Sequence, residues 1–323
     1  MTDTLHIPAS IGAFQICSSE SITGDASCRR YWRVVLEQGG TAILCRYPGP
    51  WRSVVKRDLE VLKWLGERNL PVPQILAGDA QNLWVLLEDL GPVDGEQALV
   101  ETPSAARIER TIPLVDPLIR LAALPVRQLP PWNPSLDQAF LRWELTGFEM
   151  WSLSTATRHT AHRTLQPWFD KLAAVVAGHP QAICFRDFHL NNILLNTDGR
   201  VGVIDVQDLR RGPDTYDLAS LLGDRAMPDL LTADQRQTIA EYWAEGVGAT
   251  PGWQHRLEVT TLQRALKVLG TFAFLSARGL PHYQRWIPKT ASAAAGLARS
   301  CGAPAEAITI LLELAATGGS DVW

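Results

Sequence analysis

The sequence predicts an α+β fold with two lobes, a small β-rich N-terminal lobe and a larger, mainly helical C-terminal lobe. Short segments of β type with turn signals fill the first 90 residues, whereas long helical patterns dominate after Gly91. A chain of 323 residues is also too long for one small core. We therefore expect a first lobe over residues 1–90 and a second over residues 91–323.

The first lobe is expected to contain a hairpin, a helix and a further strand. Tyr31–Leu36 and Thr41–Tyr47 are strand-like segments separated by a glycine-containing turn. Val54–Arg68 has apolar residues at helical spacing with charged residues between them. Leu83–Leu87 has the pattern of a buried strand and ends before the sequence Glu88–Gly91. This order predicts a small sheet with one helix packed on it.

The second lobe is expected to be built from long helices. Thr232 precedes one of them and Gln235 follows three residues later, which is the pattern of a capping box. The expected helices span residues 104–123, 136–153, 159–177, 233–246, 253–278 and 305–316.

A β-rich island interrupts these helices. Ile183–Phe185, Ile193–Asn196 and Val201–Val206 read as three short strands. Asp198 and Gly199 supply a tight turn between the last two strands. The island therefore contains a short hairpin.

Charge and cysteine content exclude several classes of function. A net charge of −4 gives no electrostatic reason to bind nucleic acid or an anionic membrane. The N-terminus lacks the pattern of a secretory signal, and no apolar run approaches the ~18 residues of a membrane span. The five cysteines are scattered, without metal-site spacing. We expect a cytoplasmic protein with reduced thiols.

The β-rich island carries polar residues in the order that phosphoryl transfer requires. Asp187 is followed five residues later by Asn192, and a strand–turn–strand then leads to Asp205. In this chemistry one carboxylate meets the acceptor hydroxyl, while a second carboxylate and an amide oxygen hold Mg²⁺ against a triphosphate. The sequence therefore predicts a kinase.

This stretch resembles the catalytic and metal-binding loops of the aminoglycoside phosphotransferase and choline kinase group, distant relatives of protein kinases. The resemblance implies a two-lobed, protein-kinase-like fold that uses ATP and Mg²⁺. It makes Asp187 the catalytic base and Asn192 and Asp205 the metal ligands. It makes His189 a loop histidine that orders the loop, and Asp217 a carboxylate that braces the loop from a helix start. Phe185 departs from the histidine usual at its position, and a Phe packed inward can substitute for that brace.

By the same resemblance, a cation in the first lobe pairs with the phosphates of the nucleotide. The position expected for a lysine falls in a segment whose only cation is Arg46. Its acidic partner on the following helix would be Asp58 or Glu60, of which Asp58 fits the family pattern better. The resemblance thus assigns Arg46 and Asp58 to nucleotide binding.

Two further segments of the first lobe are assigned to the nucleotide by the resemblance. Ser27 lies where kinases have the loop that covers the phosphates, although an ordinary polar loop fits these residues nearly as well. The main chain around Glu88 and Leu90 lies at the expected hinge, where it would meet the adenine ring.

A narrower resemblance extends over most of the chain, to bacterial kinases that phosphorylate N-acetylmuramate and N-acetylglucosamine at the anomeric hydroxyl. It implies a sugar substrate and a role in cell-wall recycling. It is carried by residues 24–33, 86–91, 202–208, 212–222 and 263–283.

The same resemblance suggests which residues bind the sugar. It places Glu144 on the helix that faces the sugar, although a solvated carboxylate is an equal alternative, and it includes Asp208. If the sugar carries a lactyl carboxylate, Arg210 or Arg211 would pair with it.

Two other functions remain open at this point. One is a kinase of another small hydroxyl compound or amine, including an aminoglycoside. The second helical lobe has no acidic run to bind such a polycation, and Arg210 and Arg211 follow the metal loop directly. The other is a nucleotide-binding pseudokinase scaffold, suggested by Phe185 and the missing lysine.

Overall fold

The computed structural model describes residues 10–22, 28–195 and 199–317. The chain forms two compact units. The first comprises residues 1–98 with 191–208, and the second comprises residues 99–190 with 209–323. Residues 191–208, which the sequence prediction assigned to the second lobe, therefore pack with the first unit. Within the described ranges, none of the helices is both long and apolar enough to cross a membrane.

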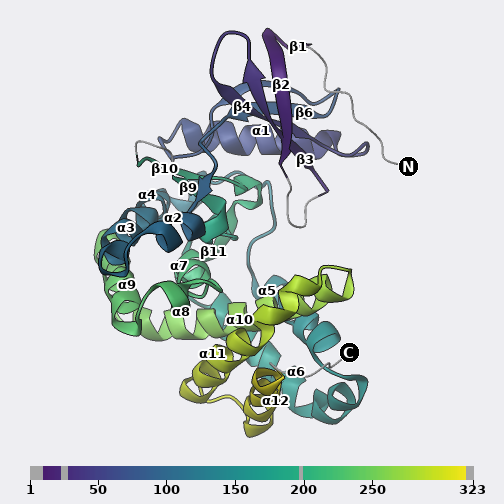
Figure 1. The fold of residues 1–323 in the computed structure, drawn as a ribbon. Helices are drawn as coiled ribbons and strands as arrows, with labels where there is room; N and C mark the ends of the chain where they lie inside the picture. Colours follow the sequence, from purple (N-terminus) through teal and green to yellow (C-terminus); the bar gives the residue numbers. More distant parts are fainter. Residues whose placement is uncertain (1–9, 23–27, 196–198, 318–323) are drawn as a thin grey trace. The chain divides into compact units, whose positions relative to one another are not determined.

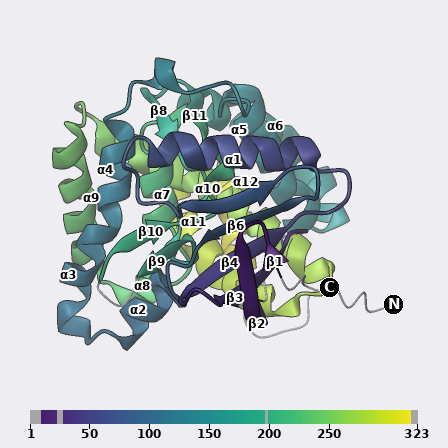
Figure 2. The same cartoon turned by 90° about the horizontal axis from the view of Figure 1, so that it is seen from above.

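The first unit is built on a six-stranded antiparallel sheet with the strand order β1-β2-β3-β4-β6-β5 (Figure 1). Helix α1 (Arg52–Gly66) lies along one face of this sheet (Figure 2) and buries Val55, Val61 and Leu65. The strands are β1 (Ser10–Ile11), β2 (Phe14–Ile22), β3 (Arg30–Leu36), β4 (Thr41–Arg46), β5 (Ile75–Asp79) and β6 (Trp84–Glu88).

A second, smaller sheet belongs to the same unit. It joins β7 (Val93–Asp94), β9 (Ile193–Leu195) and β10 (Val201–Val203) in the order β10-β9-β7, with antiparallel pairs. The predicted hairpin is therefore present as β9 and β10, and Asp198 of its expected turn lies outside the described residues. Gly202 of β10 faces Leu90, and a Cβ atom at Gly202 would lie 2.4 Å from Leu90 Cδ1.

The second unit is mainly helical, and α10 contacts α5, α6, α7 and α11. Its only sheet within the described residues pairs β8 (Gln181–Cys184) with β11 (Arg210–Pro213). Its longer helices are α5 (Gln138–Gly147), α6 (Thr155–Ala177), α9 (Ala233–Val247), α10 (Trp253–Ala277), α11 (Ile287–Ser300) and α12 (Ala305–Ala316). Its shorter helices include α3 (Arg107–Thr111), α4 (Asp116–Ala122), α7 (Tyr216–Leu222) and α8 (Met227–Leu230), and α2 (Gly95–Glu101) crosses the unit boundary.

The sequence predicted most of these elements, with instructive exceptions. The capping box at Thr232 and Gln235 is present at the start of α9. The single helix expected over residues 104–123 is wrong, because short helical pieces replace it. Pro113 and Pro117 each lie at the second position of a new piece, since a proline has no backbone N–H for a continuing helix. Helix α11 was not predicted.

Candidate active site

The loop after β8 presents Asp187, and carboxylates elsewhere in the second unit hold its backbone. Asp217, in the first turn of α7, accepts hydrogen bonds from the N–H groups of Phe185 at 2.6 Å and Arg186 at 2.9 Å. Asp224 accepts one from Leu190 N–H at 3.3 Å. From the first turn of α7, Asp217 thus holds the loop before Asp187, and Asp224 holds it after Asp187.

Three cations surround the Asp187 carboxylate. Lys267 Nζ lies 3.2 Å from Oδ1, Arg186 Nη1 lies 3.8 Å from Oδ2, and Arg264 Nη2 lies 4.0 Å from Oδ1. Burial acts to raise the pKa of Asp187, but the charges of Lys267, Arg186 and Arg264 hold it well below its usual range. Asp187 is therefore an ionised acceptor at neutral pH, suited to orienting a hydroxyl group.

Arg186 has a backbone conformation that a bulky residue rarely adopts, with φ of +82°. Such strain persists only where the surroundings hold the residue, and it is concentrated at functional sites. Here Arg264 donates to the Arg186 carbonyl oxygen at 3.0 Å, and Asp217 accepts the Arg186 N–H. The distorted peptide next to Asp187 is thus fixed by partners on two helices.

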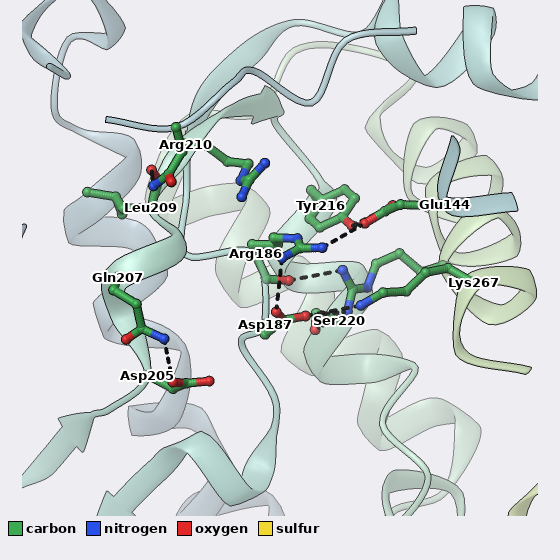
Figure 3. Close-up of polar contacts among 12 residues, drawn as sticks. Glu144, Arg186, Asp187, Asp205, Gln207, Leu209, Arg210, Tyr216, Ser220 and Lys267 are labelled. Atoms are coloured by element: carbon green, nitrogen blue, oxygen red, sulfur yellow. Dashed lines mark hydrogen bonds and ion pairs between the residues drawn. The ribbon is translucent and has the colours of Figure 1, made fainter. Parts of the chain in front are cut away.

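Glu144 is buried, which corrects the alternative reading of the sequence that made it a solvated helix carboxylate. Its side chain is 1% exposed and accepts from Arg186, Tyr216 and Gln263 at 3.4, 3.1 and 3.1 Å (Figure 3). A buried carboxylate needs such donors. Glu144 therefore anchors Arg186.

The other predicted site residues, Asn192 and Asp205, belong to the first unit and lie on neighbouring strand ends of the β9–β10 hairpin. Ile204 N–H donates to the Asn192 carbonyl oxygen at 2.9 Å, which places Asp205 next to Asn192 along the ladder. Asp205 has φ of +57° and a side chain that is 40% exposed. Arg29 Nη2 at 2.7 Å and Gln207 Nε2 at 2.5 Å both donate to its Oδ1.

These two residues fit a Mg²⁺ ion that is shared with phosphates. An exposed carboxylate and an amide are hard oxygen donors, and Mg²⁺ usually takes only one or two protein carboxylates plus phosphate oxygens and water. No cluster of three or more His, Cys, Asp or Glu side chains forms a self-sufficient metal site in the described ranges. Asn192 and Asp205 therefore fit a metal ion that also binds the phosphates of a nucleotide.

Arg46 does not pair with Asp58, which corrects the sequence-based assignment. Arg46 is opposite Arg30 in the sheet, whereas its neighbour Cys45 is opposite Tyr31. Successive side chains of a strand point to opposite faces, so Arg46 lies on the other face from Cys45. Asp58 instead accepts a hydrogen bond at 3.0 Å from Tyr47, which is two residues after Cys45 and so lies on the same face as Cys45.

Arg29 takes the position expected for Arg46. Its Nη1 lies 3.6 Å from Asp58 Oδ2 while its Nη2 contacts Asp205. Tyr47 donates its hydroxyl to Asp58 at 3.0 Å, and Arg57 contacts the other carboxylate oxygen at 3.2 Å. Burial raises the pKa of Asp58, and the arginines offset part of this effect. The carboxylate of Asp58 on α1 thus has Arg29 as its long-range cation.

The remaining nucleotide-site candidates are placed as follows. Glu88 ends β6 and accepts from Gln74 N–H through its side chain at 3.1 Å, so its backbone is fixed in the sheet. Leu90 packs on Gly202 of the hairpin that carries Asp205. Ser27 lies outside the described residues.

Two aromatic rings and a histidine shape the loop around Asp187. Phe185 is 2% exposed and stacks on Phe188 with 5.5 Å between ring centroids. This agrees with the expectation that an inward-packed Phe substitutes for the usual histidine. Burial lowers the pKa of His189, which leaves the ring uncharged at neutral pH.

The two arginines proposed for a sugar carboxylate differ in environment. Arg210 is 4% exposed, its guanidinium lies 4.6 Å from the centre of the Phe140 ring, and it donates to the Pro134 carbonyl oxygen. It is therefore a packing residue. Arg211 is exposed and lines a surface cavity of about 440 Å³ together with Arg127 and polar side chains. Asp208 is half-buried in a turn.

Sequence reasoning missed Arg29, Arg264 and Lys267. The signal for the last two was present, because Gln263, Arg264 and Lys267 are polar residues on α10 among buried leucines. For Arg29 the signal was weaker. It comes directly before β3, two residues from Tyr31, and so shares a strand face with it.

Comparisons with known proteins confirm the predicted resemblance. The sequence profile described as the phosphotransferase enzyme family matches residues 19–259. An N-acetylmuramate/N-acetylglucosamine kinase of Pseudomonas aeruginosa is 30% identical over 83% of this chain and 80% of its own length. A kinase of the same name from Neisseria meningitidis is 29% identical over 90% of this chain and 88% of its own.

Solved structures show the same fold at lower identity. A choline/ethanolamine kinase family protein from Mesorhizobium loti has a TM-score of 0.59, with 14% identity, over 94% of this chain and 93% of its own. An aminoglycoside-3′-phosphotransferase of type VIII has a TM-score of 0.55, with 18% identity, over 77% and 93%. The protein-kinase-like fold predicted from the sequence is therefore confirmed.

Proposed function

The chain belongs to the phosphotransferase enzyme family and transfers phosphate to a hydroxyl group; from this premise we propose that it is an ATP- and Mg²⁺-dependent kinase of amino sugars. The acceptor is the anomeric hydroxyl of N-acetylmuramate or N-acetylglucosamine. The product would serve cell-wall sugar recycling. Because the reaction consumes a nucleoside triphosphate, we place the enzyme in the cytoplasm.

The extent of the sequence similarity carries this proposal. The similarity to the Pseudomonas aeruginosa kinase covers 83% of the chain, far more than the residues that any phosphotransferase of this fold needs. Acceptor choice depends on segments outside the catalytic loop, so similarity across the chain favours a shared acceptor class. The solved structures are less similar in sequence and support the fold alone.

In the first unit, Arg29 and Asp58 are proposed to take the nucleotide phosphates. A guanidinium that is held by a helix carboxylate presents fixed positive charge to phosphate oxygens. Asn192 and Asp205 would hold Mg²⁺, which neutralises phosphate charge when it is bound. The main chain at Glu88 and Leu90 is proposed to meet the adenine ring. ADP and AMP are present in two of the related solved structures.

In the second unit, Asp187 is proposed to orient the acceptor hydroxyl. An anomeric hydroxyl is more acidic than an ordinary alcohol, so a strongly ionised carboxylate can serve without being a strong base. Trp143 and Trp151 are 64% and 37% exposed. Exposed aromatic faces of this kind suit the apolar methyl and ring faces of an N-acetyl sugar.

If N-acetylmuramate is the substrate, Arg211 is the proposed partner of its lactyl carboxylate, since Arg210 is committed to packing. Arg211→Gln should then raise KM for N-acetylmuramate with little change for N-acetylglucosamine, because only the former carries a carboxylate. Equal effects on both sugars would remove Arg211 from this role.

The decisive test is ATP consumption with Mg²⁺ over a panel of acceptors. The panel contains both N-acetyl sugars, their 1-O-methyl glycosides and several aminoglycosides. We expect turnover of the free sugars and none of the methyl glycosides, whose anomeric oxygen is blocked.

Each other outcome has a definite meaning. Equal phosphorylation of the methyl glycosides would refute transfer to the anomeric hydroxyl. Faster turnover of an aminoglycoside would replace the proposed substrate class. Nucleotide binding without transfer to any acceptor would indicate a pseudokinase scaffold.

A further inference from the structure

Helix α10 sends two polar side chains to the loop that carries Asp187 and a third to Glu144, which contacts Arg186 of that loop. Gln263 donates to Glu144 at 3.1 Å, Arg264 donates to the Arg186 carbonyl oxygen at 3.0 Å, and Lys267 donates to Asp187 at 3.2 Å. Apart from Thr260, the other buried residues of this helix are apolar, including Leu262, Leu266 and Leu269. Burying polar or charged side chains among apolar residues costs free energy unless they are hydrogen-bonded or paired, so these three side chains need partners.

Arg264 and Lys267 are used very differently. Arg264 is 6% exposed and spends its donors on the Arg186 carbonyl oxygen and on Ser220 Oγ, at 2.7 Å for the latter. Lys267 is 18% exposed, and Asp187 Oδ1 is the one acceptor of its ammonium group in the part of the chain that the structure describes. An ammonium group has three N–H donors. Lys267 can therefore donate to Asp187 and to a bound ligand together.

Transfer of a phosphoryl group needs positive charge where negative charge develops. The loop itself does not supply this charge at His189, two residues after Asp187, because burial keeps that ring uncharged. Arg186 is drawn toward Glu144, with Nη2 at 3.4 Å from the buried carboxylate. Arg186 and Lys267 are similarly exposed, at 16% and 18%, but Arg186 is bound to Glu144. Lys267, in contrast, contacts Asp187 alone among the described residues and can make further contacts (Figure 3).

We propose that Lys267 is a catalytic residue, whose ammonium group contacts an oxygen of the transferring phosphoryl group while it holds Asp187. This inference rests on the proposed kinase function and adds a residue to its machinery. The acceptor oxygen forms a bond to the γ-phosphorus, and the bond from that phosphorus to the bridging oxygen breaks. Its electron pair stays on the nucleoside diphosphate. The acceptor proton passes to Asp187 and then to water, and Lys267 remains protonated.

The first part of the test compares Lys267→Gln and Lys267→Arg with Lys171→Gln, an exposed lysine on α6. Lys267→Gln should lower kcat by about 100-fold or more, as expected for loss of one charged donor at a transition state. KM for ATP and directly measured nucleotide affinity should change less than about threefold, because the contact forms during transfer. The kcat of Lys267→Arg should be at least tenfold higher than that of Lys267→Gln, and the kcat of Lys171→Gln should equal that of the wild type.

The second part separates a catalytic role from mere positioning of Asp187. Residual turnover is compared between Asp187→Asn and the double variant Asp187→Asn/Lys267→Gln. If Lys267 contacts the phosphoryl group, the double variant should be at least tenfold slower than Asp187→Asn alone. Equal residual rates would show that Lys267 acts only through Asp187, and would overturn the proposal.

Folding and acceptor identity are controlled separately. If thermal unfolding shows that Lys267→Gln is not folded, Lys267→Met replaces it in the kinetic comparison, because methionine keeps the unbranched apolar stem of the lysine. An unchanged kcat in either folded variant would also overturn the proposal. If the wild type accepts neither N-acetyl sugar, the proposed acceptor is wrong. The Lys267 comparison is then made with the acceptor that is used, or with water in ATP hydrolysis.

Discussion

Arg29 and Asp205 form an ion pair with 2.7 Å between Nη2 and Oδ1, although 176 residues separate them in the sequence. The other nitrogen of the same guanidinium lies 3.6 Å from Asp58 on α1. Arg29 therefore connects the helix carboxylate with the carboxylate proposed to bind Mg²⁺. We expect the Arg29 guanidinium to exchange a carboxylate for phosphate oxygens when a nucleotide binds.

Arg29→Gln should raise KM for ATP at least tenfold, whereas Arg46→Gln should change it less than about twofold. The physical reason is that Arg29 lies with Asp58 and Asp205, while the strand alternation turns Arg46 to the other face. Steady-state kinetics at saturating acceptor give both values. The KM of Arg29→Lys for ATP should lie between those of the wild type and Arg29→Gln, since lysine keeps the positive charge but lacks the planar guanidinium group that binds two oxygens at once.

The two arginines serve as controls for each other, because both changes remove one positive charge, Arg29 directly before β3 and Arg46 at the end of the paired strand β4. A larger effect at Arg46 would restore the sequence-based assignment and contradict the one from the structure. Equal, small effects would exclude both residues from phosphate binding.

Asn192→Ala and Asp205→Ala should each shift the dependence of turnover on Mg²⁺ to higher concentration and lower the maximal rate. Loss of one oxygen ligand leaves the triphosphate less neutralised. Titration of activity with Mg²⁺ at fixed ATP measures the shift. Full activity at low Mg²⁺ in either variant would show that the residue is not a ligand.

Asn191→Ala is the matched control for this prediction. Asn191 is the neighbouring amide, and its Nδ2 donates to Asp94 and Glu96 at 3.0 and 3.1 Å. Its replacement should lower thermal stability without moving the Mg²⁺ midpoint. A similar Mg²⁺ shift in this variant would mean that general damage to the hairpin explains the other two.

Local patterns were sufficient to predict the hairpin next to the proposed catalytic loop, but not the residues that surround Asp187. Asp187, Asn192 and Asp205 lie on one short stretch, so the β9–β10 hairpin could be read directly from alternation and turn residues. The capping box at Thr232 depends on contacts three residues apart and was equally readable. Lys267 is 80 residues from Asp187, and no local pattern reports such a contact.

The errors have physical causes of the same kind. Arg46 was selected by its position along the chain, whereas the face of the strand decides which residues it meets. Glu144 has the sequence environment of an ordinary helix carboxylate, and its burial arises from Tyr216 and Gln263 on distant elements. Tertiary contacts, which a single sequence does not display, determine both.

Gly270→Ala should lower the free energy of unfolding by about 1–3 kcal/mol, the usual effect of overpacking a core. At this point α10 meets the end of α5, and a Cβ atom at Gly270 would lie 2.4 Å from Gly147 C and from Phe148 N. Backbone atoms of a packed helix cannot move aside as a flexible side chain can. Denaturant unfolding measures the change.

Gly296→Ala gives the opposite expectation in a second helix. Gly296 lies within α11, and no atom is within 4 Å of a Cβ built there. The substitution should therefore stabilise the protein by about 0.5–1 kcal/mol, through the higher helix propensity of alanine. If Gly270→Ala were stabilising as well, the close approach of α10 and α5 would be wrong.

As the pH falls, the free energy of unfolding should decrease, in part because of His179. This side chain is buried, and its Nδ1 lies 3.3 Å from Thr260 Oγ1. Burial lowers the pKa of His179 from 6.5 to about 4, with Asp214 opposing this effect and Arg256 and His255 adding to it. Between pH 6.5 and 4 the unfolded chain binds a proton that the folded chain excludes.

The free energy of unfolding should therefore decrease as the pH falls through this window. One such proton contributes a slope of at most about 1.4 kcal/mol per pH unit, and the contribution stops changing below about pH 4. His179→Gln should remove this part of the slope, whereas the exposed His159→Gln should retain it. Thermal unfolding midpoints of the three proteins at pH 7, 6, 5 and 4.5 test the prediction. Parallel curves for the wild type and His179→Gln would show that His179 takes up its proton equally well in the folded and the unfolded chain.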